Sequence, residues 1–259
     1  MRCMGLDNVD LKAVADLGIT LLQVPGHSPY SVAEQAVTLL LGLVRHLPEA
    51  NHRVRTGNFA IDGLMGNDLH GKTVGVIGAG RIGKVFARIM LGFGCKVLAY
   101  DLRPDPRLIE AGVQYCLLSD ILTQSDIISL HCPLTPLTDT IIDVYSLSAL
   151  KPNAILINTA RGRLVDTKAV LNALDADQLG GYAADVYEQE WPYFHYNYST
   201  KPIADDLLNR LRSHPKVLLT AHQGFLTEEA LRQMARNLLN QFTFYANQQM
   251  MMVTKASMC

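Results

Sequence analysis

The 259-residue sequence lacks the features that mark several large classes of protein. It has no basic run and a formal net charge of −1, which argues against nucleic acid as a partner. Its five cysteines are odd in number, scattered and without CxxC spacing. We therefore expect reduced thiols, and neither a disulfide scaffold nor a metal site.

Features of membrane and secreted proteins are missing as well. No positively charged leader followed by an apolar stretch opens the chain. The most apolar helix candidate, residues 36–44, is far shorter than the roughly 20 residues that span a bilayer. The length allows one large domain or two smaller ones. These observations predict a cytoplasmic, enzyme-like protein without a membrane partner.

What the sequence does contain is a glycine-rich segment, TVGVIGAGRIG, at residues 73–83. An apolar run ends in Gly78, Gly80 and Gly83 with the spacing GxGxxG. A helix-forming segment follows, and a second apolar run closes on Asp101. This order is the fingerprint of a dinucleotide-binding βαβ unit. For the glycines alone, a structural turn is the alternative.

Each glycine of the motif has a physical task. Gly78 permits the tight turn, Gly80 lets the backbone approach the pyrophosphate, and Gly83 lets the helix pack closely on the strand. The first residues of the helix, Arg81 and Ile82, would present amides to the phosphates at the positive end of the helix dipole.

Asp101 indicates which dinucleotide binds. A carboxylate at the end of the second strand accepts hydrogen bonds from the ribose hydroxyls and repels a 2′-phosphate, which favours NAD over NADP. Arg103 could pair with that phosphate instead, or be an ordinary loop arginine. We expect NAD.

Short apolar runs alternate with helix candidates over the rest of the chain. The runs are mostly apolar throughout, which is typical of parallel strands buried on both faces. This rhythm predicts an α/β fold, a doubly wound parallel sheet of the Rossmann type with helices on both faces. The predicted strands are residues 73–77, 96–100, 127–131, 154–158, 180–184 and 217–220.

Other elements are predicted outside the glycine motif and its sheet. They are a helix over residues 10–17, a strand over 19–24, a helix over 28–46, a helix over 203–211 and a helix over 227–246, followed by a frayed tail over 248–259.

Polar residues follow the carboxyl ends of the predicted strands, where ligands of such sheets bind. They are Asp101, His131, Arg161, Asp185 and His222.

Three further motifs carry a resemblance to a known family. Residues 159–162 (TARG), 185–190 (DVYEQE) and 221–229 (AHQGFLTEE), together with the glycine motif, resemble the D-isomer-specific 2-hydroxyacid dehydrogenases. Residues 130–135 and the aromatic loop 193–200 resemble the D-lactate branch of that family. The resemblance extends to about Asn240, nearly the whole chain.

The resemblance implies roles in reducing a small 2-keto acid, such as pyruvate, to a 2-hydroxy acid. His222 would be the acid/base, because an imidazole with a pKa of ~6.5 carries a proton near neutral pH. Glu190 would fix its ring and raise its pKa. Arg161 would grip the substrate carboxylate and polarise the ketone. Asp185 would orient the nicotinamide ring.

Further binding residues are implied by the same match. Cofactor contacts are expected at Asp101, His131, Cys132, Pro133, Thr159, Ala160 and Asp185, and substrate contacts at Met4, Gly5, His27 and Arg161. His27 stands where the D-lactate branch has a tyrosine, and Gln35 where a histidine is common. Either change could shift the preferred keto acid or be neutral.

Each residue taken alone has a plainer interpretation. A single histidine after a strand is more often structural or at the surface, and Arg161 or Glu190 alone could be a solvated loop charge. Asp185 alone could be a turn cap. The joint occurrence of Arg161, Glu190 and His222 after separate strands of one sheet favours a site.

The resemblance also implies a two-domain homodimer. Residues 26–223 would form the NAD-binding domain, and residues 1–25 with 224–259 an incomplete, flavodoxin-like substrate domain. Aligned by eye, Met1 falls inside a strand of that domain, and about seventy residues found in relatives are absent. Met1 is either a mis-chosen start or the mark of a genuine truncation; if the truncation is genuine, we expect a chain that binds NAD but reduces pyruvate poorly or not at all. The alternatives are a catalytically silent NAD-binding interaction protein, and a glyoxylate or hydroxypyruvate reductase.

Overall fold

The computed structural model describes residues 5, 9–24, 26 and 28–256, with side chains through residue 247. The chain divides into two compact units. One is made of residues Met1–Ser31 and Phe225–Cys259, and the other is Val32–Gly224. No helix in the described part of the chain is both long and apolar enough to cross a membrane.

The larger unit is built on a seven-stranded parallel sheet. Its order is β3-β2-β1-β4-β5-β6-β7, which reverses direction between β1 and β4. Dinucleotides bind at such a reversal, beyond the carboxyl ends of the strands. The strands are β1 (Thr73–Ile77), β2 (Lys96–Tyr100), β3 (Gln114–Tyr115), β4 (Ile127–Leu130), β5 (Ala154–Asn158), β6 (Leu179–Ala184) and β7 (Val217–Leu219).

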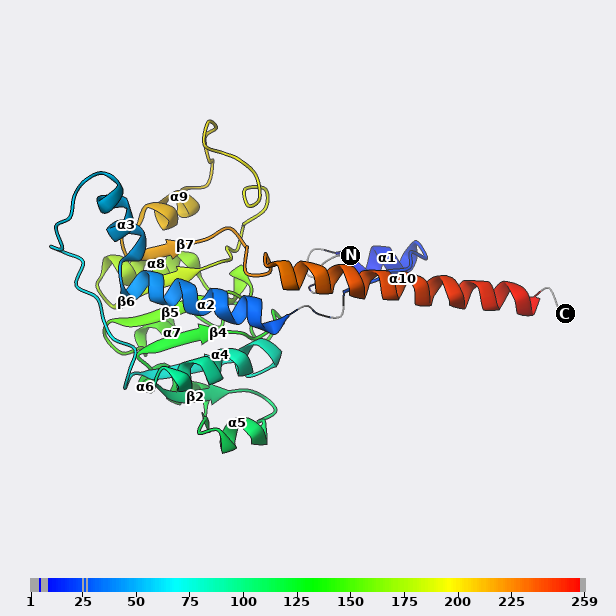
Figure 1. Cartoon of the computed structure of the whole chain (residues 1–259), viewed down its shortest axis with the longest axis horizontal. Coiled ribbons are helices and arrows are strands. Elements are labelled where there is room, and N and C mark those ends of the chain that lie inside the picture. The colour runs from blue at the N-terminus through cyan, green and yellow to red at the C-terminus, as the bar shows by residue number, and fades with distance from the viewer. Residues whose placement is uncertain (1–4, 6–8, 25, 27, 257–259) are drawn as a thin grey trace. The chain divides into compact units, whose positions relative to one another are not determined.

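Helices cover both faces of this sheet (Figure 1). One face packs against α2 (Pro29–Val44), α4 (Arg81–Gly92) and α5 (Pro106–Glu110). The other packs against α6 (Leu118–Gln124), α7 (Val144–Ser148), α8 (Thr167–Asp175) and α9 (Asp206–Ser213). A helix with no buried residue, α3 (Leu47–Arg55), follows α2, and a 3-10 turn, η1 (Gly162–Leu164), follows β5.

Successive side chains along a strand point to opposite faces of the sheet and so pack into two separate hydrophobic cores. On β1, Val74 and Val76 pack on the α2 and α4 side, whereas Ile77 packs on the other. Each of these side chains is almost fully buried, which contributes about 1.5–3 kcal/mol apiece by transfer from water. Burial on both faces explains why the strands read as apolar runs.

The smaller unit contains α1 (Leu11–Asp16) and α10 (Glu228–Ala256). The side chain of Asp10 accepts a 2.9 Å hydrogen bond from the amide of Ala13 and caps α1. The predicted strand over residues 19–24 is wrong, because these residues have no regular secondary structure. A strand needs a paired neighbour to satisfy its backbone, and the described part of this unit contains no strand. The flavodoxin-like sheet therefore stays a prediction.

Two segments differ from expectation in extent. α10 runs to Ala256, so the frayed tail expected from residue 248 is wrong over 248–256. Helix propensity is strong for the methionines and glutamines there, which outweighs the missing period. In the larger unit, α3, α5 and the two-residue strand β3 were not predicted, because short elements carry too little periodicity.

Candidate active site

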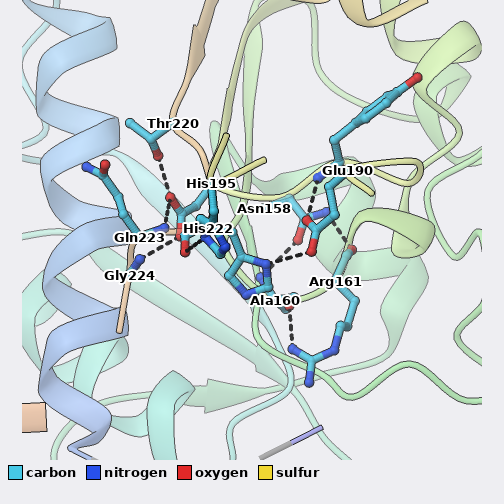
Figure 2. Close-up of polar contacts among 11 residues, drawn as sticks. Asn158, Ala160, Arg161, Glu190, His195, Thr220, His222, Gln223 and Gly224 are labelled. Atoms are coloured by element: carbon cyan, nitrogen blue, oxygen red, sulfur yellow. Dashed lines mark hydrogen bonds and ion pairs between the residues drawn. The ribbon is translucent and has the colours of Figure 1, made fainter. Parts of the chain in front are cut away.

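A histidine and a glutamate form the centre of the site (Figure 2). His222 follows β7, and its Nδ1 lies 2.7 Å from Oε1 of Glu190, in the loop after β6. The other carboxylate oxygen of Glu190 accepts a 3.3 Å bond from the amide of Tyr187. Because the carboxylate can only accept, the proton stays on Nδ1, and Nε2 is the nitrogen whose proton can be exchanged.

The surroundings of His222 favour its charged form. Burial lowers the pKa of the imidazole, but the hydrogen bond and the negative charge of Glu190 outweigh burial, and Asp185 adds to them. The positive charge of Arg161 acts in the opposite direction. The net result is a pKa above the ordinary histidine value. His222 is thus suited to hold a proton near neutral pH.

Arg161 lies in the same region and follows β5 (Figure 2). Its Nη1 donates a 2.8 Å bond to the carbonyl of Ala160. The loop is fixed by Asn158, a fully buried residue at the end of β5. Its amide donates to the carbonyl of Arg161 at 2.8 Å and accepts from the amide of Ala160 at 3.1 Å. Asn158 was not among the predicted site residues, although an asparagine that ends an apolar strand is a visible signal in the sequence.

The Arg161 loop packs tightly on the Glu190 loop through a glycine. A Cβ added to Gly162 would lie 2.0 Å from the carbonyl carbon of Tyr187 and 2.3 Å from the amide nitrogen of Glu188. Real Cβ atoms do not approach backbone so closely, so only glycine fits without movement. This contact fixes the segment after Arg161 against the segment that leads to Glu190.

Asp185 lies against the loop that carries His222 and is only 2% exposed. Its carboxylate accepts bonds from the amides of Gln223 at 2.9 Å and Gly224 at 2.7 Å, and from the hydroxyl of Thr220. Its carbonyl accepts a 2.6 Å bond from the amide of His222. Asp185 thus holds residues 222–224 in place, and its predicted contact with the nicotinamide stays a prediction.

The glycine motif forms the turn between β1 and α4. Gly78 has φ +91°, and a Cβ there would lie 2.5 Å from the amide nitrogen of Cys132. A Cβ on Gly83 would lie 2.0 Å from the carbonyl oxygen of Gly78. A Cβ on Gly80, in contrast, would meet no atom within 4 Å. Packing thus explains Gly78 and Gly83 but not Gly80, whose approach to a ligand stays a prediction.

We expect Gly80→Ala to weaken NADH binding about tenfold without loss of fold, since overpacking a site costs ~1–3 kcal/mol. Gly78→Ala should destabilise the fold, because its backbone is left-handed and its neighbour is main chain. NADH fluorescence titration and thermal unfolding of both variants check this. Equal NADH affinity in Gly80→Ala and the unmodified protein would contradict the assigned role of Gly80.

The remaining predicted cofactor contacts flank this turn. His131 packs on Phe86 at a ring distance of 4.9 Å, and its Nε2 lies 2.9 Å from the hydroxyl of Ser129. Burial lowers the pKa of His131 to about 3, so the ring is neutral and unsuited to donate a proton at neutral pH. Burial raises the pKa of the neighbouring thiol of Cys132 to about 11, which keeps it protonated.

Other predicted contacts lie after the neighbouring strands. Asp101 follows β2, and its carboxylate accepts a 2.9 Å bond from the amide of Arg103. The hydroxyl of Thr159, just after β5, is buried without a hydrogen-bond partner among the described residues. A bound ligand would supply the hydrogen-bond partner that this buried hydroxyl lacks. With the open space at Gly80, it fits a dinucleotide held across these strand ends.

The other predicted residues are divided between the units. Arg81 and Ile82 begin α4, Pro133 follows Cys132, and Ala160 precedes Arg161. Met4 and His27 lie outside the described residues, and Gly5 belongs to the smaller unit.

A doubly wound sheet with a dinucleotide-type turn and an arginine near a carboxylate-bound imidazole defines a class, the nicotinamide-dependent dehydrogenases of hydroxy acids. A model of the D-isomer specific 2-hydroxyacid dehydrogenase NAD binding domain matches residues 37–224. The chain therefore belongs to the D-isomer specific 2-hydroxyacid dehydrogenase family, whose cofactor is NAD.

Individual relatives agree with this assignment. The chain is 51% identical to a 2-hydroxyacid dehydrogenase homolog of Zymomonas mobilis, over 92% of this chain and 73% of that protein. It is 47% identical to D-lactate dehydrogenase kk1H of Curvularia clavata, over 95% and 70% of the two chains. A solved structure of the pyruvate reductase of Chlamydomonas reinhardtii is 43% identical, with a TM-score of 0.87 over 92% and 73%.

Proposed function

We propose that this protein reduces pyruvate to D-lactate with NADH. Relatives named for D-lactate and for pyruvate support this substrate. The observation that carries the proposal is the 2.7 Å contact between His222 and Glu190, with the raised pKa of the imidazole. The protein is an NAD-dependent oxidoreductase, so the proposal concerns the substrate and the residues.

The reaction consumes a hydride and a proton. When bound, NADH supplies the hydride to the carbonyl carbon. His222 gives the proton from Nε2 to the oxygen that gains charge, and Glu190 stabilises the imidazolium until then. Arg161 offers paired donors to the substrate carboxylate, and its charge polarises the ketone. The balance is pyruvate, NADH and a proton giving D-lactate and NAD⁺.

The substrate is tested with the purified protein and a panel of keto acids. We expect the highest kcat/KM with pyruvate and D-lactate as the product, identified by a stereospecific assay. Faster turnover of glyoxylate or hydroxypyruvate would assign the protein to the reductase alternative. NADH binding without turnover of any keto acid would support the silent binding protein.

The pH dependence follows from the raised pKa of His222. Reduction needs protonated His222, so the rate falls as pH rises through that pKa, which Glu190 shifts to higher pH. Glu190→Gln removes the charge, lowers the pKa, and should move the alkaline limb of the kcat/KM profile for pyruvate to lower pH. An unchanged limb would exclude Glu190 as the partner of the acid. A matched control is Glu229→Gln, at an exposed glutamate in the first turn of α10.

Two further expectations accompany the proposal. The homodimer stays a prediction, which sedimentation equilibrium of the purified protein checks. The division into an NAD domain of residues 26–223 and a substrate domain of 1–25 with 224–259 also stays a prediction.

A further inference from the structure

A second histidine lies beside His222. His195 belongs to the loop between β6 and α9, and its Nε2 lies 3.2 Å from the backbone carbonyl oxygen of His222. The two rings are 6.2 Å apart between centroids and tilted by 49°. Figure 2 shows His195 next to His222. A carbonyl only accepts, so Nε2 of His195 is the donor.

The backbone of His222 is in an unfavourable conformation. Its φ is +51°, in the left-handed region that residues with a Cβ rarely adopt. Such a conformation is unfavourable and persists only where surrounding contacts enforce it. A return to negative φ would turn the peptide and move the imidazole. The contacts that hold the backbone of His222 therefore determine where its ring lies.

Contacts hold His222 at its amide, at its ring and at its carbonyl. Its amide donates to the carbonyl of Asp185, and its Nδ1 donates to Glu190. His195 donates to the carbonyl. Asp185, Glu190 and His195 all lie in the loop between β6 and α9, with His195 further along it. The peptide after His222 is held at both of its polar groups, at the carbonyl by His195 and at the amide of Gln223 by Asp185.

His195 is suited to this contact by its own conformation. Its φ is +68°, and histidine is one of the few side chains enriched in the left-handed region. The imidazole places a donor at Nε2, the far end of the ring. An asparagine would tolerate the backbone but carries its donor closer to the chain, and a phenylalanine would keep the ring without a donor.

We propose that His195 is a positioning residue for the acid/base His222, acting through the backbone carbonyl of that residue. The inference rests on the proposed function, in which His222 gives the proton. His195 itself touches neither the substrate nor the cofactor in this proposal. Its contribution is to the rate of proton transfer, and NADH binding does not depend on it.

Three variants of His195 distinguish the role of its hydrogen-bond donor from the roles of its ring and of its backbone conformation. In His195→Asn and His195→Phe we expect kcat for pyruvate reduction to fall about three- to tenfold, the loss that one neutral hydrogen bond explains. In His195→Gln the side-chain amide reaches further, and most of the rate should return. The Kd of NADH should stay within about twofold in all three variants. His52→Asn, at an exposed histidine of α3, is the matched control and should leave kcat unchanged.

The outcomes distinguish this inference from the proposed function. A kcat within about twofold of the unmodified protein in both His195→Asn and His195→Phe overturns the positioning role, provided that His222→Gln is inactive. Equal losses in the Asn, Phe and Gln variants also overturn it, because loop packing and not the donor would then matter. Pyruvate reduction that survives His222→Gln overturns the proposed function and this inference together. A thermal midpoint within about 2 °C, with the Gln rescue, supports it.

Discussion

Replacing His222 with glutamine is expected to lower kcat for pyruvate reduction by about 10²–10⁴-fold, the usual contribution of a positioned general acid. Glutamine keeps a polar side chain of similar reach, but its amide cannot release a proton at neutral pH. Steady-state turnover at several pH values measures the loss.

NADH binding separates a chemical defect from a folding defect in this variant. The glycine turn joins β1 to α4, whereas the loop that carries His222 follows β7. The Kd of NADH in His222→Gln should therefore match that of the unmodified protein. His52→Gln, at an exposed position of α3, serves as the control. A kcat for His222→Gln within about tenfold of the unmodified protein would exclude His222 as the general acid.

The sheet could be predicted because the apolar character of its residues indicates that they are buried. Strands buried on both faces give apolar runs, and the predicted run over residues 96–100 coincides with β2. The glycine motif was predictable for a related reason, since Gly78 and Gly83 leave no room for a Cβ. In each case the local sequence carries the physical constraint.

Residues that hold the site together were harder to predict. Asn158 fixes the Arg161 loop, and Thr220 donates to Asp185. Asn158 acts on residues two and three positions further along the chain, whereas Thr220 and Asp185 meet only through the packing of separate strands. A polar residue at a strand end indicates that its side chain makes a hydrogen bond, but it does not indicate with which residue. Gln35 illustrates this, because its amide donates to Thr220 at 3.2 Å across 185 residues of sequence.

The failures at the chain's other elements have a physical cause too. Residues 19–24 were predicted as a strand from their apolar character, yet a strand exists only with a partner. α10 continues past the predicted end at about residue 246, because the Met- and Gln-rich tail keeps its helix propensity without an apolar period. Local sequence sets propensity, whereas the extent of an element depends on what surrounds it.

The site is assembled by contacts between loops as well as by the sheet. The loop after β5 is joined to the loop after β6 where Gly162 meets Tyr187. The loop after β6 is joined to the loop after β7 where Asp185 binds residues 222–224. Arg161, Glu190 and His222 each belong to one of these three loops. A disturbance at either junction should therefore move one member relative to the others.

Gly162→Ala is expected to reduce kcat/KM for pyruvate about 10²-fold, the effect of a misplacement of about 1 Å between reacting groups. The added Cβ would lie 2.0 Å from the carbonyl carbon of Tyr187 and 2.2 Å from its oxygen, and neither backbone atom can rotate away. The Arg161 loop must then move from the Glu190 loop. We expect a loss of ~1–3 kcal/mol in the free energy of unfolding, measured by urea denaturation.

Gly92→Ala is the matched control for this change. Gly92 ends α4, and a Cβ there would meet no atom within 4 Å. Alanine in a helix is more favourable than glycine by ~0.5–1 kcal/mol, so this variant should be slightly more stable and fully active. Unchanged kcat/KM in Gly162→Ala, with stability unchanged as well, would mean that the two loops can separate without cost. The geometry of Arg161 and Glu190 would then not depend on the contact at Gly162.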